Sequence, residues 1–375
     1  MMTTKITHQA AISLLALLLL FTSCDESGIQ NEAGSTERSE PTSIDTTSFT
    51  FTFEGRKYAG VLDLPQGIDV KSLIVLVPGS GKTAAYTGEW NYELRAELNR
   101  LGVATFAYDK PGCGNSEGEF DYNQTVENSS YELVAAVRAL QEQKIPGAHN
   151  IGLWGLSRAG WICPLAITKE PDINYWISVS GPNHLDNMFH LLTTNWTIEG
   201  KSEEEVNQLG QEWLAGFTIQ RAGGSYAEYQ KATPSLEQDS FMNKIRGKYN
   251  EERFLKFQSY LIDNNVKLDE ETGLQIMLED FDSILHEVTI PVLAIFGEND
   301  SQVDWKATLK LYQNSLGNTS LLQTESIPNC NHFIKTCETG GFAETRAVLE
   351  AKGLGEICPR YLSIITDWVE KQIEG

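Results

Sequence analysis

Short apolar runs that recur along the chain place the strongest limit on its fold. A strand that is apolar on both faces is typical of a parallel sheet covered by helices. The runs occupy residues 73–77, 103–108, 150–154, 175–179 and 292–296. Helical patterns lie between them, at about residues 90–101, 126–143, 158–168, 304–315 and 359–373. This alternation predicts a doubly wound α/β sheet, which binds its ligands beyond the carboxyl ends of the strands.

Two segments depart from the alternation. Residues 49–53 and 57–64 flank a Glu-Gly turn and predict an antiparallel hairpin. Residues 182–286 combine helical patterning with many aromatic side chains and lie between two sheet strands. We interpret this insertion as a helical cap over the ligand-binding edge, with most of its aromatic residues in its own core. The core domain is then expected to comprise residues 49–181 and 287–375.

The beginning of the chain has the pattern of an export signal. An apolar run over residues 10–21 is too short to span a bilayer comfortably and predicts a signal peptide at residues 1–23. The Thr-Ser-Cys sequence that ends at Cys24 resembles a bacterial lipobox, which implies lipidation of Cys24. An ordinary signal peptide with a nearby cysteine is the alternative. Residues 24–48 are polar and predict a flexible tether, so we expect an exported, lipid-anchored protein.

Charge and motif spacing exclude several kinds of partner. The formal net charge is -22, and such a chain repels nucleic acid. Gly81-Lys82-Thr83 imitates the end of a phosphate-binding loop, but Leu76 stands where the first glycine is required. We therefore expect neither nucleotide binding nor a metal or other cofactor.

Cysteines beyond Cys24 number five, so at least one is a free thiol. Disulfides persist in exported proteins, and two pairings compete. One joins Cys337 to Cys358, and the other joins Cys330 to Cys337.

A serine bracketed by small residues follows one of the apolar runs. Residues 155–160 read Gly-Leu-Ser-Arg-Ala-Gly, which predicts a strand, a sharp turn at Ser157 and the start of a helix. Such a turn exposes the hydroxyl at the carboxyl edge of a sheet. An ordinary Gly/Ser loop is the alternative. Whether the chain also supplies a base and an acid for the Ser157 hydroxyl decides between these two interpretations.

A base and an acid follow in a compatible order. His332 leaves the last predicted strand, residues 321–327, at the same edge. Asp300 follows the preceding strand and is placed to orient His332, although it also suits a turn. Glu298 and Asp304 are the alternatives, and Asp304 better suits the N-cap of the next helix.

Two backbone amides are candidates for an oxyanion hole. One belongs to Arg158, the residue after the serine, and the other to Ser80, in the loop after the first apolar run. Gly79 and Gly81 permit close approach of that loop. The Arg158 side chain is either structural or a contact for an anionic substrate.

These motifs together resemble the α/β-hydrolase superfamily, near its esterase and acyl-peptidase-like members. The resemblance rests on residues 78–81, on Tyr-Asp-Lys-Pro-Gly-Cys-Gly-Asn-Ser at 108–116, on the Ser157 turn, and on the Asp300 and His332 segments. It implies the α/β-hydrolase fold: a mostly parallel, doubly wound sheet with an N-terminal antiparallel hairpin and a mainly helical cap insertion. The turn formed by residues 109–116 is expected to be held by Asp109 rather than to supply a catalytic group.

Three positions depart from the pattern of that superfamily. Pro78 replaces a histidine, Pro111 replaces an arginine, and Ala159 stands where glycine is usual. Ala159 is small enough to preserve the turn. Pro78, by contrast, changes the first residue of the loop that is expected to supply the Ser80 amide.

The function that follows is cleavage of a small-molecule carboxylic ester through an acyl-enzyme on Ser157. A short-peptide hydrolase of the aminopeptidase or acyl-peptidase type, with the same triad, is the first alternative. A non-catalytic surface binding protein on a hydrolase fold is the second. The sequence defines neither the acyl group, the leaving group nor the oligomeric state.

Overall fold

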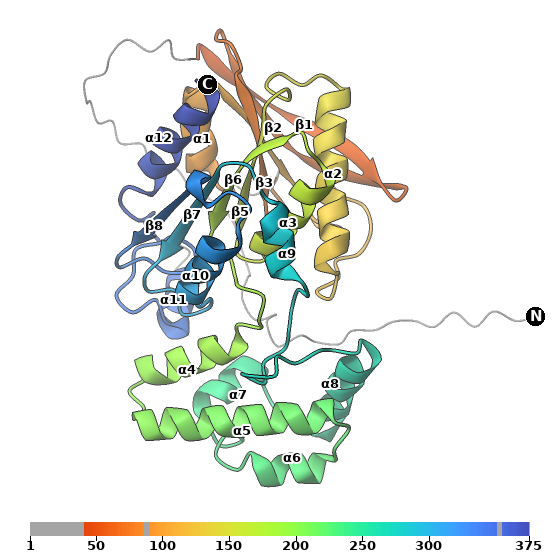
Figure 1. Cartoon of the computed structure of the whole chain (residues 1–375), viewed down its shortest axis with the longest axis vertical. Helices are drawn as coiled ribbons and strands as arrows, with labels where there is room; N and C mark the ends of the chain where they lie inside the picture. Colours follow the sequence, from red (N-terminus) through yellow and green to blue (C-terminus); the bar gives the residue numbers. More distant parts are fainter. Residues whose placement is uncertain (1–40, 86–89, 351–354, 375) are drawn as a thin grey trace, which may run out of the picture. The chain divides into compact units, whose positions relative to one another are not determined.

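The computed structural model describes residues 41–85, 90–350 and 355–374 (Figure 1). Cys24, the expected signal peptide and most of the expected tether lie outside these ranges. None of the helices within them is both long and apolar enough to cross a membrane. The described chain divides into two compact units: residues 188–277 form one, and the remaining described residues form the other.

The larger unit is built on one sheet. Within the described residues it has eight strands in the order β1-β2-β4-β3-β5-β6-β7-β8. β2 is antiparallel to both β1 and β4, and the other neighbouring strands are parallel. β3, β4 and β7 are buried along their whole length, as strands covered on both faces must be. The predicted fold is confirmed. The strands are β1 (Ser43–Phe53), β2 (Arg56–Gln66), β3 (Ser72–Val77), β4 (Val103–Tyr108), β5 (Ile151–Leu156), β6 (Ile173–Val179), β7 (Val292–Gly297) and β8 (Leu322–Ile327).

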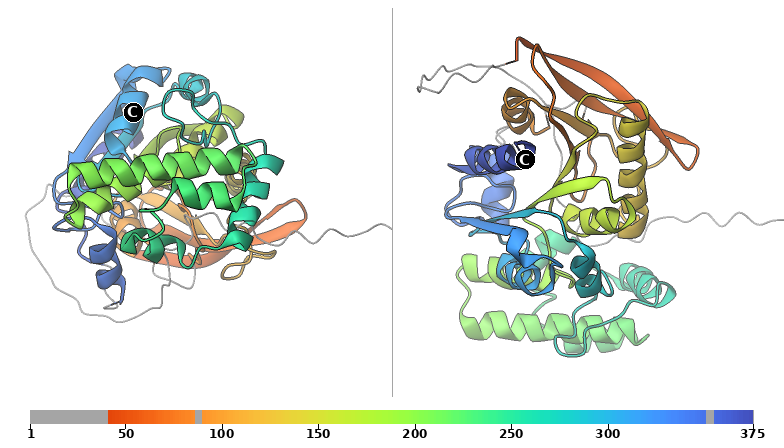
Figure 2. Two further views of the ribbon diagram at one scale, coloured as in Figure 1. Left: turned by 90° about the horizontal axis from the view of Figure 1, so that it is seen from below. Right: turned by 45° about the horizontal axis from the view of Figure 1, so that its top comes forward.

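Helices cover both faces of this sheet (Figures 1 and 2). α1 packs against α12 on one face, and α2 packs against α3, which contacts α9, on the other. Trp154 of β5 is buried, and its Nε1 donates to the Tyr361 hydroxyl of α12 at 3.0 Å. The helices of this unit are α1 (Tyr92–Arg100), α2 (Val126–Glu142), α3 (Ala159–Lys169), α9 (Phe281–Glu287), α10 (Trp305–Ser315), α11 (Phe342–Glu350) and α12 (Tyr361–Ile373), with a 3₁₀ turn η1 (Thr319–Leu321).

The first strand is longer than the sequence predicts. β1 begins at Ser43, so residues 43–48, which we expected in the tether, pair with β2 instead. All six are exposed, and backbone hydrogen bonds rather than apolar burial hold them in the strand. Thr46 Oγ1 adds a bond to Asp63 Oδ1 at 2.7 Å. The apolar alternation that signals a strand begins only at Phe49, which explains the error.

The smaller unit is helical, and it is narrower than the predicted cap of residues 182–286. α9 belongs instead to the larger unit, where its Phe281 and Leu285 are buried and it contacts α3 and α10. The helices of the smaller unit are α4 (Met188–Ile198), α5 (Glu203–Arg221), α6 (Tyr226–Ala232), α7 (Ser240–Arg246) and α8 (Glu251–Asp263).

Aromatic side chains form the core of this smaller unit. Trp196, Tyr229, Phe241 and Phe254 are each at most 4% exposed. Their polar atoms are paired: Trp196 Nε1 donates to Asp239 Oδ1 at 2.9 Å, and the Tyr229 hydroxyl accepts from Arg246 at 2.8 Å. Phe217, at 7% exposed, is buried as well, whereas the other aromatic side chains of this unit are half-buried, so the expectation that most of them form its core is met only in part.

Candidate active site

Ser157 occupies the sharp turn between β5 and α3. Its φ of 54° lies in the left-handed region, which is rare for a residue other than glycine. The Ser157 amide donates to the Val179 carbonyl at the end of β6 at 2.9 Å, and this bond fixes the turn against the neighbouring strand. Ser157 itself is partly exposed. The predicted strand, turn and helix start are therefore all present, with the serine at the carboxyl edge of the sheet.

Small residues around Ser157 are required by close packing. A Cβ atom at Gly155 would lie 2.9 Å from the Ala159 Cβ and 2.8 Å from the Cys163 Sγ, so only glycine fits there. A Cβ at Gly79 would lie 3.0 Å from the Leu156 carbonyl oxygen and 3.2 Å from the Ser157 Cβ. Ala159 is accommodated because the methyl group occupies the space that Gly155 leaves free. The loop after β3 thus lies directly against the serine turn.

His332 and Asp300 form a buried pair. His332 Nδ1 and Asp300 Oδ2 are 2.8 Å apart, and each residue is only 4% exposed. Asp300 Oδ1 accepts the amides of Gln302 and Val303 at 2.8 and 2.9 Å. Asp300 is therefore both the turn residue and the partner of the histidine. Because Nδ1 faces the carboxylate, Nε2 is the imidazole nitrogen left to exchange a proton with a hydroxyl.

The alternative acids have other roles. Asp304 Oδ1 accepts the Ala307 amide at 3.0 Å and caps α10, as its position in the sequence indicated. Glu298 Oε1 accepts the Ser326 hydroxyl at 2.8 Å on the neighbouring strand.

Strand register brings the site segments to one edge. β3 is parallel to β5, and Val77 pairs with Gly155, so the Ser80 loop and the Ser157 turn leave the sheet side by side. β7 is parallel to β8, and Gly297 pairs with Ile327, so Asp300 and His332 leave it together as well. The carboxyl ends of parallel strands form the ligand-binding edge of such a sheet.

The amides of Ser80 and Arg158, which we predicted to bind an oxyanion, belong to the loop after β3 and to the serine turn. In the described part of the chain, neither the Ser80 amide nor the Arg158 amide donates to a protein acceptor. Arg158 is the N-cap of α3, where the helix dipole favours negative charge. Unpaired amides beside a strained serine suit a developing oxyanion.

The Arg158 side chain is structural. Its Nη1 donates to Ser129 Oγ at 3.2 Å and its Nη2 to the Gln124 carbonyl at 2.5 Å, so it ties the serine turn to the start of α2. Burial lowers the pKa of this guanidinium. Asp109 also holds a turn, since its Oδ2 accepts the Asn115 amide at 2.8 Å.

Lys110 is a site residue to which the sequence assigned no role. It follows β4, and its Nζ donates to the carbonyls of Gly79 and Gly81, the latter at 2.9 Å. Burial, with the nearby Arg158 guanidinium, lowers the pKa of Lys110 to about 7. The sequence feature that could have identified Lys110 is its position just after a predicted parallel strand, at the edge where ligands bind.

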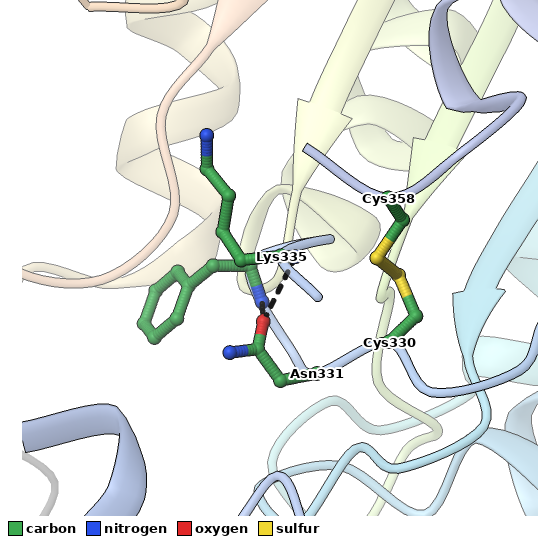
Figure 3. Close-up of a disulfide and its surroundings, with 5 residues drawn as sticks. Cys330, Asn331, Lys335 and Cys358 are labelled. Carbon is green, nitrogen blue, oxygen red and sulfur yellow. Dashed lines mark hydrogen bonds between the residues drawn. A yellow bond between two sulfur atoms is a disulfide. The ribbon is translucent and has the colours of Figure 1, made fainter. Parts of the chain in front are cut away.

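The disulfide next to the histidine differs from both predicted pairings. Cys330 is bonded to Cys358, and Cys337 is a buried free thiol (Figure 3). Cys330 lies opposite Thr336 in an isolated antiparallel bridge, so Cys337 is displaced by one residue from the position that faces Cys330. The Asn331 side-chain oxygen, beside the disulfide, accepts the amides of Phe333 and Lys335 at 2.9 and 3.1 Å. The His332 loop is therefore held by a covalent bond and by local hydrogen bonds.

Removal of this disulfide by Cys330→Ser with Cys358→Ser is expected to lower the Tm by roughly 5–10 °C. The bond closes a loop across 28 residues, for which the chain-entropy contribution is about 3.5 kcal/mol. Calorimetry measures the shift. Cys337→Ser is the matched control and should change the Tm by less than about 2 °C. An unchanged Tm in the double variant would contradict the assigned pairing.

A separate cavity of about 910 Å³ lies at the opposite edge of the sheet. Residues 64–70 and 144–149 contribute most of its lining, including His149. They precede or connect the amino ends of the parallel strands, so this cavity is remote from the edge that carries Ser157. It contains none of the candidate catalytic residues.

Comparison with known families agrees with this geometry. A sequence profile of the family described as serine aminopeptidase, S33, matches residues 68–335, which extend from before β3 to just beyond His332. The chain belongs to this family. As a serine aminopeptidase S33 family member it is an α/β-hydrolase, and the resemblance inferred from its motifs is confirmed. Curated proteins offer no match.

Solved structures similar to this S33 family member include three hydrolases. The Pyrococcus furiosus esterase Pf2001 is 13% identical, with a TM-score of 0.50 over 88% of this chain and 92% of the esterase. A proline iminopeptidase from Mycobacterium smegmatis is 14% identical, with a TM-score of 0.49 over 88% and 99%. Est1E from Butyrivibrio proteoclasticus, with ferulic acid bound, is 18% identical, with a TM-score of 0.47 over 86% and 96%. At these identities the Pf2001 match supports the fold.

Proposed function

We propose that this S33 family member is a serine hydrolase that cleaves carboxylic esters through an acyl-enzyme on Ser157. The observation that carries the proposal is the buried 2.8 Å pair of His332 Nδ1 and Asp300 Oδ2 at the sheet edge where Ser157 occupies its strained turn. An acid, a base and a nucleophile in this chain order support acyl transfer through a serine ester.

The proposed reaction begins when Ser157 Oγ attacks the ester carbonyl carbon while His332 Nε2 takes the hydroxyl proton. The carbonyl oxygen becomes an oxyanion, which the amides of Ser80 and Arg158 bind. His332 then gives its proton to the leaving alcohol, and the carbon–oxygen bond to that alcohol breaks. Water then attacks the acyl-serine ester while His332 Nε2 takes its proton. The bond between the carbonyl carbon and Ser157 Oγ breaks, His332 returns the proton to Oγ, and the carboxylic acid leaves. Asp300 keeps the imidazole in the required tautomer and stabilises the imidazolium.

A substrate panel tests the reaction class. We expect 4-nitrophenyl butyrate to be hydrolysed with a kcat/KM at least about 100-fold above that of alanine or proline 4-nitroanilide, because an anilide is the less reactive carbonyl. The family description favours amide hydrolysis as the second candidate. A preference for the aminoacyl anilides would replace the esterase assignment with an aminopeptidase. If none of these substrates is hydrolysed and a fluorophosphonate does not react with the protein, the results would favour a non-catalytic binding protein.

Export and lipid anchoring belong to the same proposal. The apolar run at residues 10–21 and the Thr-Ser-Cys sequence that ends at Cys24 support a lipidated Cys24 on a bacterial membrane. The Cys24→Ser variant should move from the detergent-extracted membrane fraction to the aqueous fraction. If the wild-type protein and the Cys24→Ser variant partition equally into the membrane fraction, the proposed lipid anchor on Cys24 is wrong.

A further inference from the structure

Lys110 reaches from the end of β4 to the loop after β3, residues 78–81, which we call the oxyanion loop. Its Nζ donates to the carbonyl oxygens of Gly79 and Gly81, on either side of Ser80. The Lys110 amide adds a third bond, to the Thr83 carbonyl at 3.0 Å. One residue therefore holds both flanks of the proposed oxyanion donor.

The geometry of a peptide bond gives this contact a consequence. The Gly79 carbonyl and the Ser80 amide belong to one planar trans peptide unit, so the C=O and the N–H point in opposite directions. When Lys110 holds the Gly79 oxygen, it directs the Ser80 N–H to the other side of the loop. The loop lies against the serine turn, because a Cβ at Gly79 would be 3.2 Å from the Ser157 Cβ.

The surroundings of Lys110 maintain this contact. Its Nζ lies 5.9 Å from the Phe120 ring centroid, and the ionisable groups that act on it are Arg158, Cys113 and Glu132. The pKa of about 7 means that both charge states exist near neutral pH. A neutral amine retains two N–H donors, enough for both carbonyls. The contact is therefore available on either side of neutrality.

We propose that Lys110 is a positioning residue that aims the Ser80 amide at the oxyanion, an inference that rests on the proposed function. It acts through the loop rather than on the substrate. Its loss should weaken stabilisation of the transition state and leave ground-state binding nearly unchanged.

The test compares Lys110→Met with Lys82→Met. Lys82 is exposed and lies at the same 5.9 Å from the Phe120 ring, so it controls for loss of a nearby cation. Competent sites are first counted with a fluorophosphonate that labels Ser157. We expect kcat per competent site for 4-nitrophenyl butyrate to fall about 10- to 100-fold in Lys110→Met, with KM within about twofold. Lys82→Met should retain the wild-type kcat.

A second measurement separates positioning from stability. A trifluoromethyl ketone forms an oxyanion on the serine, and its affinity should fall by the same factor as kcat/KM in Lys110→Met. Lys110→Gln keeps an NH₂ donor, so its kcat and its affinity for the ketone should lie between those of wild type and Lys110→Met. This variant still tests the proposal if the methionine variant fails to fold. Ser157-dependent hydrolysis with unchanged kcat in both Lys110 variants would overturn the role of Lys110 alone. Wild-type hydrolysis that survives Ser157→Ala would overturn the proposed function as well.

Discussion

Ser157→Ala is expected to lower kcat for 4-nitrophenyl butyrate by about 10⁴-fold or more. The substitution removes the oxygen that we propose as the nucleophile, whereas the amides of Ser80 and Arg158 remain. Only the residual catalysis of the oxyanion site should survive. Initial-rate kinetics of the purified variant, with binding of the substrate's amide analogue as a check on the site, measure the effect.

Ser180 offers a matched control for this substitution. It directly follows the adjacent strand β6 and has a φ of 49°, so both serines have left-handed backbones at the same sheet edge. Within the described residues the Ser180 hydroxyl is buried without a hydrogen-bond partner, so Ser180→Ala should leave the fold and kcat nearly unchanged. Equal losses in both variants would indicate a general disturbance of this edge rather than removal of a nucleophile.

Asp300→Asn is the second substitution with a large expected effect, a fall in kcat of about 10³- to 10⁴-fold. The asparagine oxygen can still accept the amides of Gln302 and Val303, so the turn is preserved. Its NH₂ group then faces His332 Nδ1 as a donor and moves the imidazole proton to Nε2. A protonated Nε2 cannot accept the Ser157 proton. Steady-state kinetics and a thermal melt of the same preparation measure activity and folding together.

Asp304→Asn provides the control for that experiment. Asp304 is the N-cap of α10, and asparagine caps a helix about as well as aspartate. Its kcat should stay within about twofold of wild type. If Asp304→Asn loses activity while Asp300→Asn keeps it, Asp304 rather than Asp300 is the acid that orients His332.

Much of the fold could be predicted because its signals are local. Strands such as β3 and β7 are apolar on both faces, which the sequence shows directly. Ser157, Asp300 and His332 each follow a predicted strand, so all three are expected at the edge formed by the carboxyl ends of the parallel strands. The beginning of β1 was missed because cross-strand backbone bonds, rather than side-chain burial, hold residues 43–48.

Other features depend on contacts between distant residues. The Cys330–Cys358 bond depends on the bridges that join residues 330, 335, 336 and 357 after the last strand, and the spacing of the cysteines does not specify these bridges. Lys110 bonds the oxyanion loop some 30 residues earlier in the chain, and its role follows from the parallel pairing of β3 with β4. The end of the smaller unit was overestimated because α9 also lies between β6 and β7 in the chain, whereas burial of its Phe281 and Leu285 places it in the larger unit.

Mass spectrometry of the fluorophosphonate-treated protein tests the central claim most directly. The account predicts one phosphonyl group per chain, located on Ser157 in the peptide map, and an unmodified mass for Ser157→Ala under the same conditions. Labelling of another residue, or no labelling of a folded wild-type protein, would contradict the assignment of Ser157 as the nucleophile.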